Sequence, residues 1–307
     1  MPTTSVVITT HNRPHLLPRA IASAQAAGTD VEVVVVDDAS NDETAEVCRN
    51  LSGIRYVRVE RNQQVAGARN IGILNSTGHY IAFLDDDDVR LAGSLDLQAA
   101  ALSSAPEAGL IYGQALINDP EQVGTEMLYL RRCPQGDVFW ELLEQNFIPC
   151  GAAVFRRSCL LRIGLLDQSV PGIDDWDLWI RIAAFYTVIV IEQPVLVWRK
   201  SSPTSGQGTS RADQLVKIST RLMHRKWFEL QPAVDACAKK RREVYRRFSK
   251  NMASHLAFET VRAVREGSLF CARRNAVAAL QLHPWSSVKL ALSLTLRKRT
   301  SKQRHPD

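Results

Sequence analysis

The segment Tyr80-Ile81-Ala82-Phe83-Leu84-Asp85-Asp86-Asp87-Asp88 decides the fold class and locates the candidate site. Its first five residues are mostly apolar, with β-branched and aromatic members, which is typical of a strand buried in a sheet. Four carboxylates follow where the strand leaves the sheet. Because adjacent negative charges repel one another and are costly to bury unpaired, a neutralising partner is expected. A divalent cation held by oxygen ligands is one candidate, and a solvated acidic loop is the alternative.

Buried strands and helices alternate along the chain around this segment. The expected strands are 5–10, 31–36, 54–59, 80–84, 109–113, 152–156 and 187–191, and the expected helices are 16–27, 43–51, 69–74, 95–103, 138–143, 157–163 and 172–179. This alternation predicts an α/β fold with a parallel sheet covered on both faces. In such sheets ligands bind beyond the carboxyl ends of the strands. Thr9, Asp38 and Asp87 lie at or just past three such ends, which indicates one shared site.

Charge is unevenly distributed along the 307 residues. Residues 1–200 carry 16 Lys and Arg against 25 Asp and Glu, whereas residues 201–307 carry 22 against 7. An acidic front part and a basic back part indicate two functional regions. We expect a catalytic domain over residues 1–200, a flexible Ser/Thr-rich loop or linker over 201–212, and a basic helical region over 213–307.

Cysteines and apolar runs indicate the compartment. The six cysteines show no C-x-x-C spacing and no clustering with histidine, so neither a structural zinc nor a disulfide framework is expected. Free thiols are typical of a reducing compartment. The first residues show no basic segment followed by an apolar core, and no apolar stretch approaches the length that spans a bilayer. We therefore expect a cytoplasmic protein.

Five short motifs occur in a characteristic order. They are Val6-Val7-Ile8-Thr9-Thr10-His11-Asn12-Arg13, Val36-Asp37-Asp38-Ala39-Ser40, Ala68-Arg69-Asn70-Ile71-Gly72, Phe83-Leu84-Asp85-Asp86-Asp87-Asp88 and Asp174-Asp175-Trp176-Asp177-Leu178-Trp179. Together they resemble the family 2 glycosyltransferases, which use nucleotide sugars and have the GT-A fold, over roughly residues 4–200. The resemblance implies a mixed, mainly parallel, Rossmann-like sheet with helices on both faces. It also implies an inverting glycosyltransferase of the bacterial type that acts in polysaccharide, lipopolysaccharide or other glycoconjugate synthesis.

The resemblance further implies which residues contact the nucleotide. Thr9 and Asp38 are expected at the base, where the ionised Asp38 carboxylate accepts a hydrogen bond from a ring N–H of uracil or thymine. His11 takes a base-stacking position at which relatives often have Tyr. Arg69 is expected near the nucleotide or its diphosphate, because a guanidinium group matches the geometry of phosphate oxygens. A salt bridge to the aspartates of 85–88 is the alternative for Arg69. The implied donor is a UDP- or dTDP-sugar.

The acidic run occupies the position of the family's D-x-D motif. The resemblance makes Asp87 the most direct ligand of Mn²⁺ or Mg²⁺, with Asp85 bound directly or through water or the ribose. The cation would bridge both phosphates and neutralise the leaving nucleoside diphosphate. Asp86 is kept among the nucleotide-binding candidates, although Asp86 and Asp88 also fit the roles of spectators or helix caps.

Asp175 matches the position of the family's catalytic base. An acceptor hydroxyl is a poor nucleophile until a base takes its proton as it attacks the anomeric carbon. One carboxylate opposite the leaving group is enough for direct displacement with inversion, whereas glycoside hydrolysis uses two. Asp174 and Trp176 are the expected acceptor-side residues. Capping of the following helix is the alternative for Asp174 and the favoured role of Asp177, and Trp179 is expected in the core.

The basic region 213–307 has three candidate roles. It is a solvated appendage, or it contacts the anionic inner face of a membrane as basic amphipathic helices do, or it binds nucleic acid. Nucleic acid is not expected, because no nucleic-acid motif accompanies the charge. Residues 288–296 followed by Arg297-Lys298-Arg299 fit peripheral membrane contact weakly. The expected acceptor is a saccharide or a lipid-linked molecule, and membrane contact would have a purpose if the acceptor is lipid-linked.

Two other functions fit part of the pattern. A nucleotidyltransferase shares the nucleotide-binding architecture and an acidic metal site, but it would carry a Gly-rich loop and a Lys that residues 5–20 lack. A non-catalytic nucleotide-binding scaffold would need neither an intact D-x-D motif nor Asp175. The donor sugar and the acceptor depend on residues 118–150 and 201–210, for which the motifs carry no code.

Overall fold

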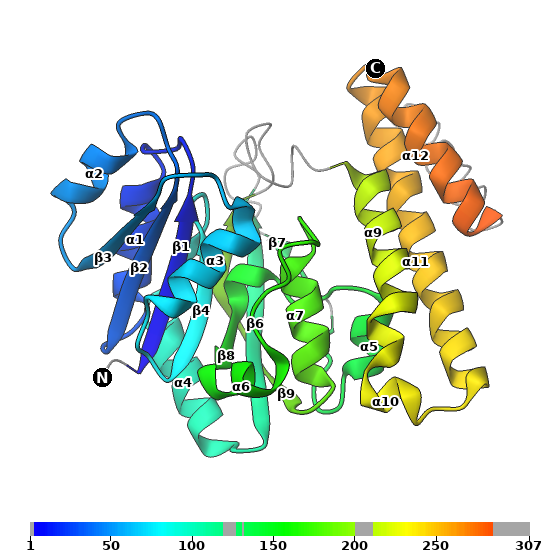
Figure 1. The fold of residues 1–307 in the computed structure, drawn as a ribbon, viewed down its shortest axis with the longest axis horizontal. Coiled ribbons are helices and arrows are strands. Elements are labelled where there is room, and N and C mark those ends of the chain that lie inside the picture. Colours follow the sequence, from blue (N-terminus) through cyan, green and yellow to red (C-terminus); the bar gives the residue numbers. More distant parts are fainter. Residues whose placement is uncertain (1–2, 119–126, 131, 200–210, 285–307) are drawn as a thin grey trace, which may run out of the picture. The chain divides into compact units, whose positions relative to one another are not determined.

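A computed structural model describes residues 3–118, 127–130, 132–199 and 211–284. Residues 201–210 of the expected loop and the whole segment 288–299 lie outside the described residues. The chain divides into two compact units (Figure 1). The first, here called the sheet unit, comprises Met1–Leu142 and Asn146–Thr209, and the second, the helical unit, comprises Leu143–Gln145 and Ser210–Asp307.

The sheet unit is built on one mixed sheet. Its strands are β1 (Thr4–Thr10), β2 (Val31–Asp38), β3 (Ile54–Val59), β4 (Tyr80–Asp85), β5 (Val89–Arg90), β6 (Ala108–Asn118), β7 (Met127–Leu128), β8 (Ala153–Arg156) and β9 (Thr187–Arg199). Their order is β3-β2-β1-β4-β8-β6-β9-β5, with β7 beside β6. Strands β1 to β4 are parallel to one another, as are β6 and β9, while β8 runs antiparallel to β4 and β6. The sheet is therefore mixed and mainly parallel, as expected.

Helices cover both faces of this sheet. They are α1 (Leu17–Ala26), α2 (Thr44–Asn50), α3 (Gln64–Leu74), α4 (Ser94–Ser104), α5 (Phe139–Glu144), α6 (Leu160–Ile163) and α7 (Asp174–Ala183), with short 3-10 turns at Cys150–Ala152 and Arg157–Cys159. The residues of β1 show the two faces of the sheet, because successive side chains of a strand point to opposite sides. Val6 and Ile8 join the apolar cluster that contains Leu17 of α1, whereas Val7 lies against Gly72 of α3.

The helix α3 approaches the sheet closely at Gly72. A Cβ atom at this position would clash with Cγ1 of Val7 and lie 3.2 Å from Cγ2 of Val36. We predict that Gly72→Ala lowers the free energy of unfolding by about 1–3 kcal/mol, because overpacking outweighs the better helix propensity of alanine. Urea denaturation measures this change. Leu74 of the same helix is 71% exposed, so the control Leu74→Ala should stay within about 0.5 kcal/mol of the wild type. A Gly72→Ala variant as stable as the wild type would contradict the close approach.

The helical unit is built from α9 (Ala212–Arg225), α10 (Gln231–Val234), α11 (Ala238–Arg265) and α12 (Leu269–Leu282), with a 3-10 turn at Trp227–Glu229. Val216 of α9, Leu256 of α11 and Ala279 of α12 share one apolar cluster. The expectation of a basic helical region is confirmed for the described residues. None of the described helices has the length and hydropathy needed to cross a membrane. All six cysteines are free in this structure.

Candidate active site

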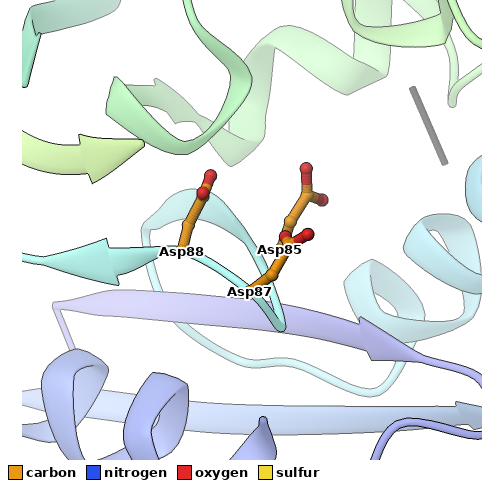
Figure 2. A group of neighbouring side chains, drawn as sticks. All are labelled: Asp85, Asp87 and Asp88. Atoms are coloured by element: carbon orange, nitrogen blue, oxygen red, sulfur yellow. The ribbon is translucent and has the colours of Figure 1, made fainter. Parts of the chain in front are cut away.

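The acidic run forms the turn that joins β4 to β5. The backbone N–H of Asp88 donates to the carbonyl oxygen of Asp85 at 3.0 Å, which closes a four-residue β-turn. The turn brings carboxylate oxygens of Asp85, Asp87 and Asp88 within 4.8 Å of one another, and Figure 2 shows the three side chains projecting from it. Asp88 was expected to be a spectator or a cap, so its place in this group is a correction.

The chemistry of these three side chains fits a divalent cation. Carboxylate oxygens are the donors that Mg²⁺ and Mn²⁺ prefer. Burial raises the pKa of both Asp87 and Asp88 above its ordinary value, and the neighbouring Asp85 carboxylate raises it further. One oxygen of Asp88 also accepts a hydrogen bond from the backbone N–H of Arg199 at 2.9 Å. A bound cation would offset both the burial and the mutual repulsion of these groups.

Asp86 is turned away from the other three aspartates. Its side chain is fully buried, forms an ion pair with Arg13 at 2.7 Å and accepts a hydrogen bond from the hydroxyl of Thr10 at 2.8 Å. Burial raises the pKa of Asp86 to about 7. These contacts fasten the β4–β5 turn to the end of β1. Asp86 is thus an internal anchor of the turn in this structure, and its expected nucleotide contact stays a prediction. Arg13, which also lies 3.4 Å from Asp87, is a site residue that the sequence analysis missed, although it belongs to the first motif.

Thr9, His11 and Asp38 gather at the carboxyl ends of β1 and β2. Nδ1 of His11 lies 2.7 Å from the backbone carbonyl oxygen of Asp38. Because a carbonyl oxygen only accepts, Nδ1 carries the proton. The imidazole ring is exposed, whereas Thr9 and Asp38 are buried. Burial raises the pKa of Asp38, while the backbone N–H of Gln63 donates to one of its oxygens at 2.6 Å. The three residues expected at the nucleobase thus meet at one edge of the sheet.

Three non-glycine residues at this edge have a left-handed backbone. The φ angle is 54° at Asn12 and 62° at Ala39, in the loops that follow β1 and β2, and 59° at Gln64, the first residue of α3. Each such conformation costs about 1–3 kcal/mol and persists only where the surroundings hold it. Here the N–H of Asn12 donates to Oγ of Ser40 at 2.9 Å, and the N–H of Gln64 donates to the side chain of Asn62 at 3.0 Å. The loops are therefore fixed by their own hydrogen bonds.

Arg69 of α3 connects the acidic turn to the start of α7. Its guanidinium group donates to Asp85 at 2.8 Å and to Asp174 at 2.9 Å, and it lies 5.2 Å from the ring centroid of Phe83. Arg69 and Asp174 are both buried. The salt bridge that the sequence left as the alternative for Arg69 is therefore present, and its contact with the diphosphate remains a prediction. Asp174 is the buried partner of Arg69 and does not cap α7, and its expected acceptor contact stays a prediction.

Asp175 lies at the start of α7, next to this salt bridge. One of its carboxylate oxygens accepts a hydrogen bond from the backbone N–H of Trp176 at 2.6 Å. Burial, and then the adjacent Asp174, raise the pKa of Asp175 to about 7, while Arg69 acts in the opposite direction. A carboxylate with a pKa near neutrality suits general-base catalysis at physiological pH.

The remaining expected residues of α7 belong to the interior. Trp176 is buried, and its indole N–H donates to the carbonyl oxygen of Leu142 at 2.7 Å. Trp176 is only 4% exposed, and its expected acceptor contact stays a prediction. Asp177 is paired with Arg181 at 2.8 Å, and no side-chain hydrogen bond caps α7, so the expected capping role is corrected. Trp179 is fully buried, as expected.

A series of contacts joins these groups at one edge of the sheet unit. His11 binds Asp38 and lies two residues before Arg13, which pairs with Asp87. Arg69 then joins the acidic turn to α7. At the start of α7, the charge of Arg69 lowers the pKa of Asp175 and the charge of Asp85 raises it. The structure thus links the expected base contacts, the candidate cation ligands and the candidate general base through short interactions.

We predict that Arg69→Gln moves the acid limb of the kcat/KM profile to higher pH. Arg69 lowers the pKa of Asp175, so its loss lets that pKa rise further above its usual value. A general base acts when deprotonated, so activity increases with pH through its pKa and would require a higher pH in the variant. Profiles between about pH 5.5 and 9 measure the shift. The control Arg181→Gln removes another buried arginine of the sheet unit and should lower stability without moving the limb. An unmoved limb in Arg69→Gln would contradict the assignment.

The sequence of the sheet unit identifies its family. Residues 5–164, about half of the chain, match the model of Glycosyl transferase family 2. The chain therefore belongs to family 2 of the glycosyltransferases.

Three known proteins illustrate this relationship. Over 208 residues, 66% of this chain, the sequence is 28% identical to an uncharacterized glycosyltransferase of Rickettsia felis, 33% of which is covered. Over 183 residues it is 27% identical to the Escherichia coli UDP-Glc:alpha-D-GlcNAc-diphosphoundecaprenol beta-1,3-glucosyltransferase WfgD, covering 58% of this chain and 68% of that one. The fold is similar to that of mannosyltransferase PcManGT from Pyrobaculum calidifontis in complex with GDP-Man and Mn²⁺, with a TM-score of 0.56 at 20% identity over 92% and 87% of the two chains.

The chain spans about a third of the length of its relatives from Rickettsia felis and Rickettsia conorii. The structural likeness to the mannosyltransferase, at low sequence identity, establishes the GT-A type of fold.

Proposed function

We propose that this protein is an inverting, metal-dependent glycosyltransferase that moves a sugar from a UDP- or dTDP-linked donor to a hydroxyl acceptor. One observation carries the proposal. Arg69 joins the carboxylate turn that suits a cation to the helix that presents Asp175, a carboxylate of raised pKa. The family match supports glycosyl transfer. The E. coli relative, named for UDP-Glc and a diphosphoundecaprenol-linked sugar, supports a lipid-linked saccharide acceptor in glycoconjugate synthesis.

In the proposed reaction Asp175 is the general base. Its carboxylate takes the proton of the acceptor hydroxyl while the hydroxyl oxygen forms a bond to the anomeric carbon of the donor. The bond from that carbon to the diphosphate oxygen breaks on the opposite side, and its electron pair leaves with the diphosphate, which inverts the anomeric configuration. A divalent cation held by Asp85, Asp87 and Asp88 would supply positive charge to the leaving diphosphate. Arg69 holds Asp85 and Asp174 in position on either side.

The donor nucleotide is proposed to bind at the ends of β1 and β2. The exposed imidazole of His11 is free to stack on the base, and the Asp38 oxygen opposite the Gln63 contact accepts a ring N–H of uracil or thymine. Thr9 lies beside them at the end of β1. The preset left-handed loops support this role, because a binding edge that is already ordered loses less entropy when the nucleotide binds.

Thermal shift with donors and cations tests the proposal. The protein is treated with EDTA and then given Mn²⁺ or Mg²⁺, a nucleotide sugar, or both. We expect the melting temperature to rise most with a UDP- or dTDP-sugar and a cation together, since a ligand at 100 times its Kd adds about 2.7 kcal/mol of stability. Product anomers analysed by NMR then report inversion. If no nucleotide sugar gives a cation-dependent shift, the proposal is wrong. Release of inorganic diphosphate from a nucleoside triphosphate and a sugar phosphate would instead indicate a nucleotidyltransferase.

A further inference from the structure

The helical unit has a groove between α9 and α12 with a volume of about 420 Å³. One part of its lining is apolar and comes from both helices, with Val216 on α9 and Ala278 and Leu282 on α12. The other part is cationic and comes from α9, with Lys217, Arg221 and Arg225. The groove therefore combines an apolar part and a positively charged part in its lining.

The positive charge of this groove is in excess. Lys217, Arg221 and Arg225 are exposed and follow one another at intervals of four residues, so they lie along one side of α9. Asp213 is the only acidic residue within α9 and α12. It is buried and already pairs with Arg274 at 2.6 Å and with Lys217 at 3.8 Å. No acidic side chain of these two helices remains to neutralise Arg221 and Arg225.

An exposed apolar stripe runs along α12 beside the groove. Phe270, Val277 and Leu280 are 73%, 47% and 45% exposed. With the exposed Arg273 between them, they recur every three or four residues and so lie on one side of the helix. Gln281, which lines the groove, follows Leu280 and lies one turn beyond Val277, so the stripe borders the groove. Several exposed large apolar side chains on one side of a helix are a feature of interaction surfaces.

We propose that this α9–α12 face binds the surface of a bilayer that contains anionic phospholipid. The cations of α9 contact lipid phosphates at the groove, and the apolar side chains of α12 enter the boundary between headgroups and acyl chains. Helices that lie in a membrane interface combine a basic side with bulky apolar residues in this way. A planar surface fits better than a compact protein epitope, because the apolar stripe from Phe270 to Leu280 extends about 15 Å along its helix axis.

This inference rests on the proposed function only for the purpose of membrane contact, which is access to a lipid-linked acceptor. The face consists of described residues of α9 and α12. It is thus a different part of the basic region from residues 288–299, on which the sequence alone based its weak membrane hypothesis.

Vesicle flotation of the full chain tests the inference. The vesicles contain phosphatidylcholine alone or with about 30% phosphatidylglycerol, and NaCl is varied. We expect co-flotation with the anionic vesicles, loss of most of it at about 0.5 M NaCl, and none with the neutral vesicles. The triple variant Lys217→Gln/Arg221→Gln/Arg225→Gln should partition about a hundredfold less, since each cation near an anionic surface contributes separately. The variant Phe270→Ser/Leu280→Ser should also float less.

Matched variants on α11 serve as controls. Lys239→Gln/Arg246→Gln/Lys250→Gln removes the same charge from exposed positions that do not line the groove, and Phe258→Ser removes an exposed apolar side chain that is 53% exposed. Both should float like the wild type. Equal losses in groove and control variants would overturn the inference, as would binding to neutral vesicles alone. Sedimentation that shows a dimer, dissociated by Phe270→Ser/Leu280→Ser without lipid, would overturn it in favour of self-association.

A second measurement separates this inference from the proposed function. The cation-dependent thermal shift with donor should be the same in all these variants, because none of the substituted residues belongs to the sheet unit. If that shift is absent in the wild type while salt-sensitive flotation is present, the proposed function fails and the lipid-binding face stands.

Discussion

Replacing Asp175 with asparagine should reduce sugar transfer by about 10²–10⁴-fold, the range typical of a lost general base, while donor binding stays unchanged. The amide has nearly the same size and its oxygen can still accept the hydrogen bond from the N–H of Trp176. It cannot take a proton from the acceptor hydroxyl. Steady-state kinetics measures the loss of transfer, and the cation-dependent thermal shift measures donor binding.

Stability provides an internal check on this variant. Burial and Asp174 raise the pKa of Asp175 above its unfolded value, so the ionised group destabilises the folded protein as pH rises through that range. Asp175→Asn should therefore melt at the same or a higher temperature near pH 8. The control Glu107→Gln changes an exposed carboxylate just before β6 and should leave transfer unaltered. An Asp175→Asn variant that keeps more than about a tenth of the activity would refute the role as base.

The second large effect is expected at Asp87. In Asp87→Ala one of the three clustered carboxylates is missing, so the cation site loses a charged oxygen donor. We expect transfer to fall by about 10²–10³-fold and the cation concentration for half-maximal rate to rise at least about tenfold, because leaving-group stabilisation is worth several kcal/mol. Titration of transfer with Mn²⁺ measures both changes, with Glu107→Gln as the control of equal charge. A variant with the wild-type cation dependence would exclude Asp87 as a ligand.

The sequence predicted the first four strands to within two residues because each is rich in β-branched or aromatic residues and ends in turn residues. It missed how far β9 extends, to Arg199. Glu192, Gln193 and Pro194 indicate the end of a strand, but the structure accommodates Pro194 where the pairing of β6 and β9 shifts register. The helix α3 begins at Gln64, five residues before the predicted start. Its first residue has a positive φ, which no periodicity indicates.

The sequence predicted where the candidate site lies in the fold, but only in part what each of its residues contacts. Strand ends placed Asp38 and Asp87 at one edge, because parallel strands deliver their carboxyl ends together. The sequence could not show which of four adjacent aspartates points inward, since side-chain direction in a turn depends on local dihedral angles. Only the structure of the turn shows that the Asp86 side chain pairs with Arg13 and that the Asp88 carboxylate lies with those of Asp85 and Asp87. The pairing of Arg69 with Asp174 spans 105 residues, so it depends on the tertiary fold that brings α3 close to the start of α7.

The left-handed residues Asn12, Ala39 and Gln64 have a consequence for engineering. Glycine adopts such dihedral angles without steric penalty, so a laboratory selection for thermostability would find Ala39→Gly and its counterparts attractive. The same change would free the backbone of the loops at which we propose that the nucleotide binds. Glycine substitutions that raise the melting temperature at these three positions should therefore weaken binding of the nucleotide. Such a trade-off between stability and function is frequent where function depends on a strained conformation.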